Sequence, residues 1–157
     1  MLKFIKISFV LAILFENLNA QNHLNKTNLA IYCSCNPMKS SIIYISLRYI
    51  KTIDPDTFTD LASLQGLHLN SNQILSIDPA TFIGLTSLRS LYLNSNQILS
   101  IDSAAFTGLS SLRVLELSYN QISSIDPAAF TDLTSLRWLY LNSNQISSIH
   151  RWKRNRN

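Results

Sequence analysis

The chain repeats itself every 24 residues, and this period limits its fold more than any other feature. Residues 64–87 and 88–111 share 17 of their 24 positions, so the second stretch is a near copy of the first. A further copy fills 112–135, an incomplete one fills 136–149, and a more divergent one fills 40–63. A fixed period of this length is typical of a solenoid, in which each unit packs only against its neighbours. We therefore expect stacked coils rather than a closed globule with one central cleft.

Apolar side chains recur at fixed places in the units and predict the core of each coil. Leucines alternate with variable residues at the fourth and sixth places, as in a short strand whose two leucines face inward. Isoleucine and phenylalanine recur later in the unit and are expected to line the opposite wall. About seven large apolar side chains per unit, at about 1.5–3 kcal/mol each, contribute on the order of 10–20 kcal/mol. Because ordering the unit costs at least as much, no unit is expected to be stable alone.

An asparagine occupies the ninth place, at the turn that follows the strand. A buried amide has two donors and a carbonyl acceptor, so it can pair with backbone groups that the turn leaves open between coils. We expect a structural asparagine ladder rather than ligand contacts. Its members are Asn72, Asn96, Asn120 and Asn144.

Three Asp-Pro pairs follow the strand-and-turn part of the units. An aspartate before a proline is a typical helix N-cap, so we expect short helical or 3-10 turns after Asp54, Asp78 and Asp126. Each of these units offers one such carboxylate, whereas calcium takes about six to eight oxygen ligands. We therefore expect no metal site along this column.

The recurring pattern LxxLxLxxNxIxxIxxxxFxxLxx resembles the leucine-rich repeat family, in its typical 24-residue extracellular class. The resemblance covers about residues 40–149. It implies an α/β-type solenoid, a horseshoe segment with a parallel β-sheet on its concave face and short helical or 3-10 turns and loops on its convex face. That class includes Toll-like receptors, matrix proteoglycans, neuronal adhesion proteins and variable lymphocyte receptors. It also implies that the concave face is the usual binding surface.

The places that vary most between units lie beside the strand leucines. Side chains at the third and fifth places point out of the sheet, onto its exposed face. Large side chains with a polar end suit protein recognition, although tyrosine also stabilises strands and stacks from rung to rung. We favour a protein-binding face. Its candidate residues are Tyr44, His68, Tyr92, Glu116 and Tyr140 at the fifth place, with Val114 and Trp138 at the third.

A column of arginines occupies the second place of three units, at Arg89, Arg113 and Arg137. Such a column could bind an acidic partner. The alternative, which the sequence alone favours, is a solvated edge whose charges contribute little to stability.

Residues 1–20 have the pattern of a cleavable secretory signal. Lys3 and Lys6 give a basic start, 7–15 form an apolar run, and Ala20 offers a small residue for cleavage. The run is too short to span a membrane, and no later segment approaches the ~20 apolar residues of a membrane helix. We therefore expect a secreted, extracellular protein with no membrane span in this chain; an uncleaved anchor or an amphipathic helix at 1–20 is the alternative.

Residues 21–39 are expected to form a degenerate N-terminal cap. Cys33-Ser34-Cys35 resembles part of the disulfide-bonded cap of the leucine-rich repeat class, which usually has four cysteines, whereas this chain has two. Two cysteines at this spacing rarely bond to each other without strain, so we expect reduced thiols or partners on another chain. Asn25-Lys26-Thr27 is an N-glycosylation acceptor, which predicts a glycoprotein modified at Asn25.

The net charge of +4 depends on the end of the chain. Residues 21–149 hold seven basic and eight acidic residues, whereas 150–157 hold four basic residues and no acidic one. The repeat pattern stops after Ile149, and two interpretations stay open. We favour a truncated fragment of a larger receptor or adhesion protein; the other is a basic tail at 150–157 for an anionic polysaccharide or lipid. A nucleic-acid partner is not expected, because the repeats themselves are not basic.

These patterns predict a non-catalytic module that binds a protein or peptide on its concave face. The alternative is a structural, self-associating matrix scaffold. We expect no enzyme and no cofactor, since the chain has no phosphate loop, metal-ligand cluster or nucleophile motif. His68 also lacks a carboxylate on either adjacent rung.

Overall fold

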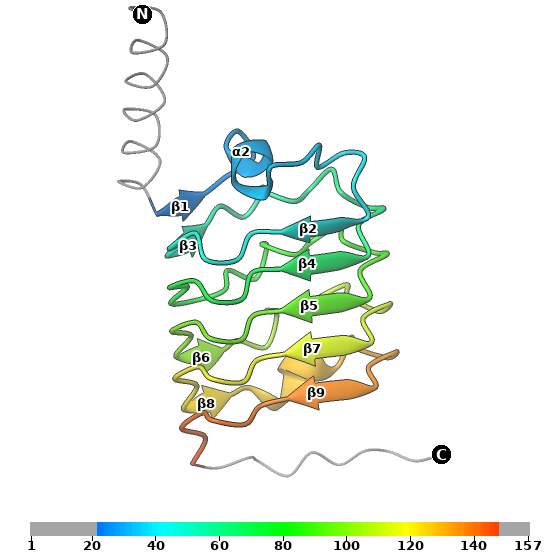
Figure 1. The fold of residues 1–157 in the computed structure, drawn as a ribbon. Coiled ribbons are helices and arrows are strands. Elements are labelled where there is room, and N and C mark those ends of the chain that lie inside the picture. The colour runs from blue at the N-terminus through cyan, green and yellow to red at the C-terminus, as the bar shows by residue number, and fades with distance from the viewer. Residues whose placement is uncertain (1–21, 148–157) are drawn as a thin grey trace, which may run out of the picture.

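The structure is a computed structural model, and it describes residues 22–147 (Figure 1). The predicted signal at 1–20, the end of the incomplete repeat, and the predicted tail at 150–157 lie outside the described residues. Among the described residues, no helix has both the length and the apolar character needed to cross a membrane.

Five parallel strands form one sheet along one side of the molecule (Figure 1). Their order follows the chain, and each strand pairs with the strand of the next unit at an offset of 24 residues, as in the pairing of Leu67 with Leu91. This architecture confirms the predicted parallel-strand solenoid. The strands are β2 (Ile42–Tyr44), β4 (Gly66–His68), β5 (Ser90–Tyr92), β7 (Val114–Glu116) and β9 (Trp138–Tyr140).

Smaller elements complete the coils along the stack, and three of them, β1 (His23–Leu24), β3 (Thr52–Ile53) and α2 (Leu29–Cys33), lie at its N-terminal end (Figure 1). Two short parallel pairs accompany the main sheet, and a five-residue helix precedes the first coil. One 3-10 helix forms on the outer wall of the described residues. These elements are β1 paired with β3, β6 (Ser100–Ile101) paired with β8 (Ser124–Ile125), α2 and η1 (Pro127–Phe130).

The core lies between the sheet and the outer wall, and it is continuous from coil to coil. The central strand leucines Leu67, Leu91 and Leu115 are all fully buried. On the outer wall, a column of phenylalanines stacks with ring centroids 6.4, 6.4 and 6.2 Å apart. We call Phe58, Phe82, Phe106 and Phe130 the phenylalanine column.

The ninth-place asparagines join each coil to its neighbours through the backbone. Asn96 is buried, and its amide nitrogen donates to the carbonyl oxygens of Leu69 and Leu93, both at 3.0 Å. Its amide oxygen accepts from the Ile74 backbone N–H at 3.0 Å. Backbone groups of two successive coils are thereby paired inside the molecule, where water cannot reach them. Asn72, Asn120 and Asn144 make corresponding contacts.

Aspartates at the start of the outer turns accept backbone hydrogen bonds two residues later. Asp126 accepts from Ala128 N at 2.8 Å and caps η1, while Asp78 accepts from Ala80 N at 2.8 Å at the start of a turn. Asp54 is different, because β1 brings His23 beside it and the His23 Nε2 lies 2.9 Å from its carboxylate. The predicted helical turns are therefore mostly simple turns rather than helices.

The cysteine prediction was wrong. Cys33 and Cys35 are bonded to each other, with their Cα atoms 5.2 Å apart, so neither is a free thiol. The reason lies in Ser34, which ends α2 in the left-handed region at φ 51° and ψ 36°. This conformation turns the chain back on itself and brings the Cα atoms within the ~4.4–6.8 Å that a disulfide spans.

Candidate functional site

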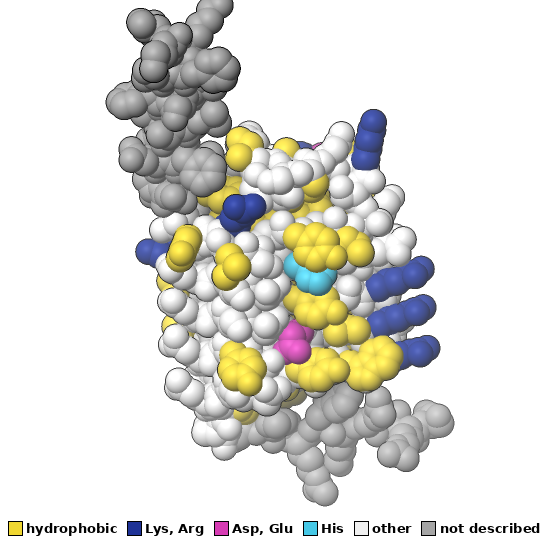
Figure 2. Space-filling view, in the orientation of Figure 1, with side chains coloured by type: hydrophobic (Ala, Val, Ile, Leu, Met, Phe, Trp, Pro, Cys, Tyr) yellow, Lys and Arg dark blue, Asp and Glu magenta, His cyan; other side chains and the backbone are white. Residues whose placement is uncertain are grey.

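The outward side of the five-stranded sheet carries the side chains that vary between units. We call this surface the sheet face; it corresponds to the predicted concave face. Figure 2 shows hydrophobic and aromatic side chains gathered along it. The strand register aligns two columns, which are Tyr44, His68, Tyr92, Glu116 and Tyr140 at the fifth place, and Ile42, Gly66, Ser90, Val114 and Trp138 at the third.

Three rings of the fifth-place column stack on one another. The His68 ring lies between Tyr44 and Tyr92, with both centroid distances at 4.3 Å and interplanar angles of 29° and 17°. We call these three residues the ring stack. Because the rings stack face to face between rungs, the surface that they expose to a partner consists mainly of ring edges and phenol hydroxyls. Tyr44 is 58% exposed, so this end of the stack is open to solvent.

The His68 imidazole is the group on this face whose protonation the fold shifts. Burial between its neighbours lowers the pKa of His68 below the ordinary value of 6.5, because the charged form loses solvation. His68 therefore stays neutral near pH 7 and acts as a flat ring with two polar nitrogens.

Glu116 interrupts the aromatic column between Tyr92 and Tyr140. Its carboxylate accepts from the Ser118 backbone N–H at 2.9 Å and from the Ser118 hydroxyl. The carboxylate is thus bound to its own turn, and it places one negative charge on the fourth of the five strands.

Large apolar area is exposed at the C-terminal rung. Trp138 is 50% exposed and Tyr140 is 42% exposed, and they lie side by side on β9. Val114, on the adjacent strand, is half-buried. The third place is not uniformly exposed, however. Gly66 is buried, since a Cβ there would lie 3.2 Å from Ile42 Cγ2.

Sequence reasoning missed a further set of exposed side chains beside the sheet. Leu47, Tyr49 and Tyr119 are 73%, 61% and 61% exposed. Leu47 and Tyr119 occupy the eighth place with φ of 59° and 55°, a region that large side chains seldom adopt. The signal was available in the sequence, because the other units carry serine at this place, at Ser71, Ser95 and Ser143.

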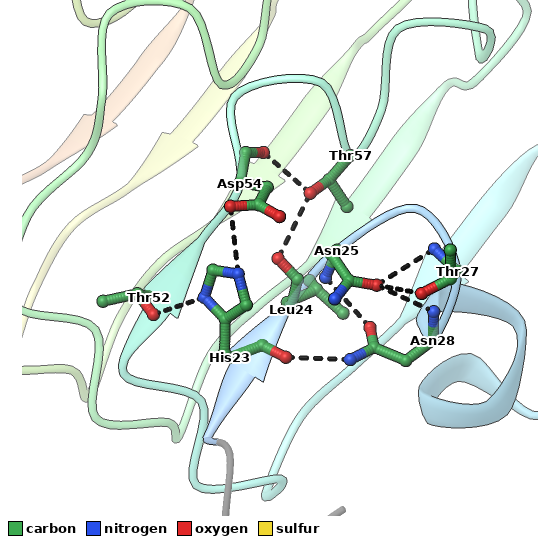
Figure 3. A network of polar contacts seen from close by, with 8 residues as sticks. All are labelled: His23, Leu24, Asn25, Thr27, Asn28, Thr52, Asp54 and Thr57. Carbon is green, nitrogen blue, oxygen red and sulfur yellow. Dashed lines mark hydrogen bonds and ion pairs between the residues drawn. The ribbon is translucent and has the colours of Figure 1, made fainter.

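The predicted glycosylation residue lies in a polar turn before α2 (Figure 3). Asn25 Oδ1 accepts from the Thr27 hydroxyl at 2.6 Å and from the backbone N–H groups of Thr27 and Asn28, both at 3.0 Å. These bonds all use the oxygen of the Asn25 amide rather than the nitrogen to which a glycan would be attached.

A second polar network joins β1 to β3 in the same region (Figure 3). His23 Nδ1 lies 2.6 Å from the Thr52 hydroxyl, and its Nε2 lies 2.9 Å from the Asp54 carboxylate. Nearby, the Thr57 hydroxyl donates to the Leu24 carbonyl at 3.2 Å. Both ring nitrogens of His23 are therefore engaged by the first coil, and we assign the network a structural role.

Titratable residues do not gather into a metal-binding cluster in the described part of the chain. Across residues 22–147, no group of three or more histidine, cysteine, aspartate or glutamate side chains could hold a metal ion. What the geometry offers is an extended surface of rings and apolar side chains.

Several solved structures share this fold. A LRIM1/APL1C complex has a TM-score of 0.73 and 25% identity, covering 82% of this chain and 23% of that one. A TLR13–ssRNA13 complex has a TM-score of 0.63 and 32% identity, covering 65% and 14%. The Toll–Spatzle complex of Drosophila has a TM-score of 0.59 and 30% identity, covering 60% and 12%. The chain thus spans less than a quarter of each of these proteins.

Sequence comparison agrees with the structural likeness. Among curated proteins there is no significant match. The family model described as leucine rich repeat matches residues 41–98 and 87–146, which together cover most of the chain. The chain belongs to the leucine-rich repeat family.

Proposed function

We propose that this chain is an extracellular, non-catalytic module that holds a protein or peptide on its sheet face. The observation that carries the proposal is the contrast between columns. In the three complete copies at 64–135, the strand leucines repeat without change and are buried, whereas the fifth-place column changes from unit to unit and remains accessible. Aromatic side chains give large contact area with few rotors to freeze, which suits protein recognition.

The surroundings of the sheet face support the same proposal. Trp138 and Tyr140 expose apolar surface side by side. Leu47 and Tyr119 add two exposed side chains at positions with positive φ, where large residues are uncommon. Contiguous exposed apolar area is uncommon on a monomer unless it makes contacts. Two of the similar structures are complexes between named proteins, LRIM1 with APL1C and Toll with Spatzle.

An extracellular location is supported by the cysteine pair. A disulfide persists in oxidising compartments and is rare in the cytosol, so the Cys33–Cys35 bond agrees with the predicted signal at 1–20. Glycosylation of Asn25 would follow from export, and mass spectrometry of the protein from a secretory host tests it. The predicted basic tail at 150–157 remains a candidate contact for an anionic polysaccharide or lipid.

The self-associating scaffold is the weaker alternative. A disulfide to another chain would have supported it, but Cys33 and Cys35 are bonded to each other. Light scattering over a range of protein concentrations separates the alternatives, because the binding module is expected to remain a monomer.

Selection from a random peptide library tests the binding proposal. Peptides selected on the full chain are expected to lose at least tenfold in affinity for Tyr92→Ala, Tyr140→Ala or Trp138→Ala. The matched controls are Ile83→Ala and Leu99→Ala, which remove exposed apolar side chains, 51% and 52% exposed, away from the sheet face. If the selected peptides bind all three sheet-face variants as tightly as the unmodified chain, the proposal is wrong.

A further inference from the structure

The arginine column forms one edge of the sheet face. Arg89, Arg113 and Arg137 each directly precede a strand of the sheet and are exposed. Their backbones are in register, because Arg113 N donates to Arg89 O at 2.8 Å and Arg137 N donates to Arg113 O at 3.0 Å. Rungs in such a sheet lie about 4.7–4.9 Å apart, so three guanidinium groups are held along one line. Figure 2 shows a column of Lys and Arg side chains projecting at this edge.

These arginines have no carboxylate partner in the part of the chain that the structure describes. The ion pairs found there join His23 to Asp54 and Lys26 to Asp60, both near the N-terminal end. At the third and fifth places of the sheet face, Glu116 is the one acidic residue, and its carboxylate is bound to Ser118. Three like charges are therefore aligned without a neutralising neighbour, and an anionic partner would relieve their repulsion.

The position of the column beside the aromatic residues restricts the kind of partner. Arg137 directly precedes Trp138 and Arg113 directly precedes Val114, so the charged edge and the apolar surface are continuous. A guanidinium group binds a carboxylate through two parallel hydrogen bonds. A partner that uses both surfaces carries carboxylates on one side and apolar or aromatic side chains on the other.

A uniformly anionic polymer fits this surface less well. Glu116 lies inside the sheet face and would repel a chain of phosphates or sulfates laid across it. Unpaired bases usually bind by stacking on open aromatic faces. The His68 ring has both faces occupied by Tyr44 and Tyr92, at centroid distances of 4.3 Å, so stacking of bases would be confined to the exposed rings of Tyr44, Trp138 and Tyr140.

We infer that the sheet face binds a protein segment that crosses the rungs, with a row of Asp or Glu side chains over the arginine column and apolar side chains over the aromatic residues. This inference rests on the proposed function and adds the chemistry of the partner. Side chains on one side of an extended segment recur every ~6.8 Å, and neighbouring side chains on one face of a helix lie about 5–6 Å apart. Long arginine side chains can reach either spacing.

The test compares two variants of the full chain that each lose two positive charges. Arg113→Gln/Arg137→Gln removes part of the column, while the control Lys39→Gln/Lys51→Gln removes two exposed charges elsewhere. Peptides selected on the unmodified chain are expected to be enriched in Asp and Glu relative to the starting library. Their affinity should fall at least tenfold for the arginine variant and less than twofold for the lysine control. Thermal melts show whether both variants remain folded.

Different failures point to different conclusions. If the selected peptides lack acidic enrichment, or bind the arginine variant unchanged, while Trp138→Ala still weakens them, the sheet face binds peptides but the inference is overturned. If neither the arginine nor the aromatic substitutions matter, the proposed function fails as well. If heparin or oligouridylate binds more tightly than the peptides, and that binding falls for the arginine variant but not for Trp138→Ala, the partner of the column is a polyanion and the inference is again wrong.

Discussion

Two columns of stacked rings run through this molecule at the same 24-residue spacing, and they differ in composition, exposure and the distance between rings. The phenylalanine column repeats one residue type inside the outer wall, with centroids 6.2–6.4 Å apart. The ring stack on the sheet face alternates tyrosine and histidine, with centroids 4.3 Å apart. The wider spacing on the outer wall fits a stack that curves toward its sheet, where strand pairing holds the rungs together.

Periodicity and structural role are therefore separate properties in this molecule. Phe58, Phe82 and Phe106 have almost no exposed surface, so any change at those places alters packing. Tyr44 and Tyr140 keep about half of their surface exposed, at 58% and 42%, so changes there alter mainly what the surface presents. Unchanged and buried columns therefore build the coil, whereas exposed columns, whether varied like the fifth place or constant like the arginine column, are the ones available for contact.

The largest expected effect is from a substitution in the phenylalanine column. Phe82→Ala removes a fully packed ring and leaves a cavity between coils, which costs about 3–5 kcal/mol. Tyr92→Ala, at a half-buried ring of the stack, should cost less than about 1.5 kcal/mol. Chemical denaturation followed by circular dichroism measures both. Equal losses of stability in the two variants would contradict the division into scaffold and surface.

A smaller effect is expected from the asparagine ladder, which is buried like the phenylalanines but acts through polar contacts. Asn96→Ala leaves the carbonyl oxygens of Leu69 and Leu93 and the Ile74 N–H without this partner. Each unsatisfied buried group costs about 1–3 kcal/mol, and a small shift of the backbone can restore part of the hydrogen bonding. We therefore expect the free energy of unfolding to fall by about 2–3 kcal/mol.

The matched control for that substitution is Asn94→Ala, two residues earlier on the partly accessible side of the turn. We expect a change of less than about 0.5 kcal/mol, which is usual for surface positions. If Asn96→Ala lowers the free energy of unfolding no more than Asn94→Ala does, water satisfies these backbone groups as well as Asn96, and the ladder contributes nothing to stability.

Much of the fold was predictable from the sequence, because identical units must stack to bury their leucines. Leu67, Leu91 and Leu115 were assigned inward by strand alternation alone, and the structure buries them fully. Conformations that depend on one backbone angle were not predictable. The Cys33–Cys35 bond depends on a compact rather than an extended backbone at Ser34, and the identity of that residue as serine does not determine which of the two it adopts.

The surface was predictable only in part, for a related reason. Strand alternation places the third- and fifth-place side chains on the sheet face, but it does not predict which of them are covered by neighbouring side chains. Gly66 is covered by Ile42 of the preceding rung, and Asp54 was diverted from its turn by His23. Both outcomes depend on contacts between segments far apart along the chain. The eighth place also escaped notice, since Leu47 and Tyr119 lie in a turn rather than on a strand.

The smallest expected effect concerns protonation in the ring stack. Because burial lowers the pKa of His68 below 6.5, the folded chain favours the neutral ring. Any stability that this adds is present above the pKa of the unfolded state and is lost as the pH falls through the lower pKa of the folded state. An NMR titration should place the midpoint of His68 below 6.5, with His68→Asn identifying its signal. Tyr92→Ala should raise the midpoint toward 6.5 by exposing the imidazole. A midpoint above 6.5 in the unmodified chain would mean that attraction between the imidazolium and the flanking tyrosine faces outweighs desolvation.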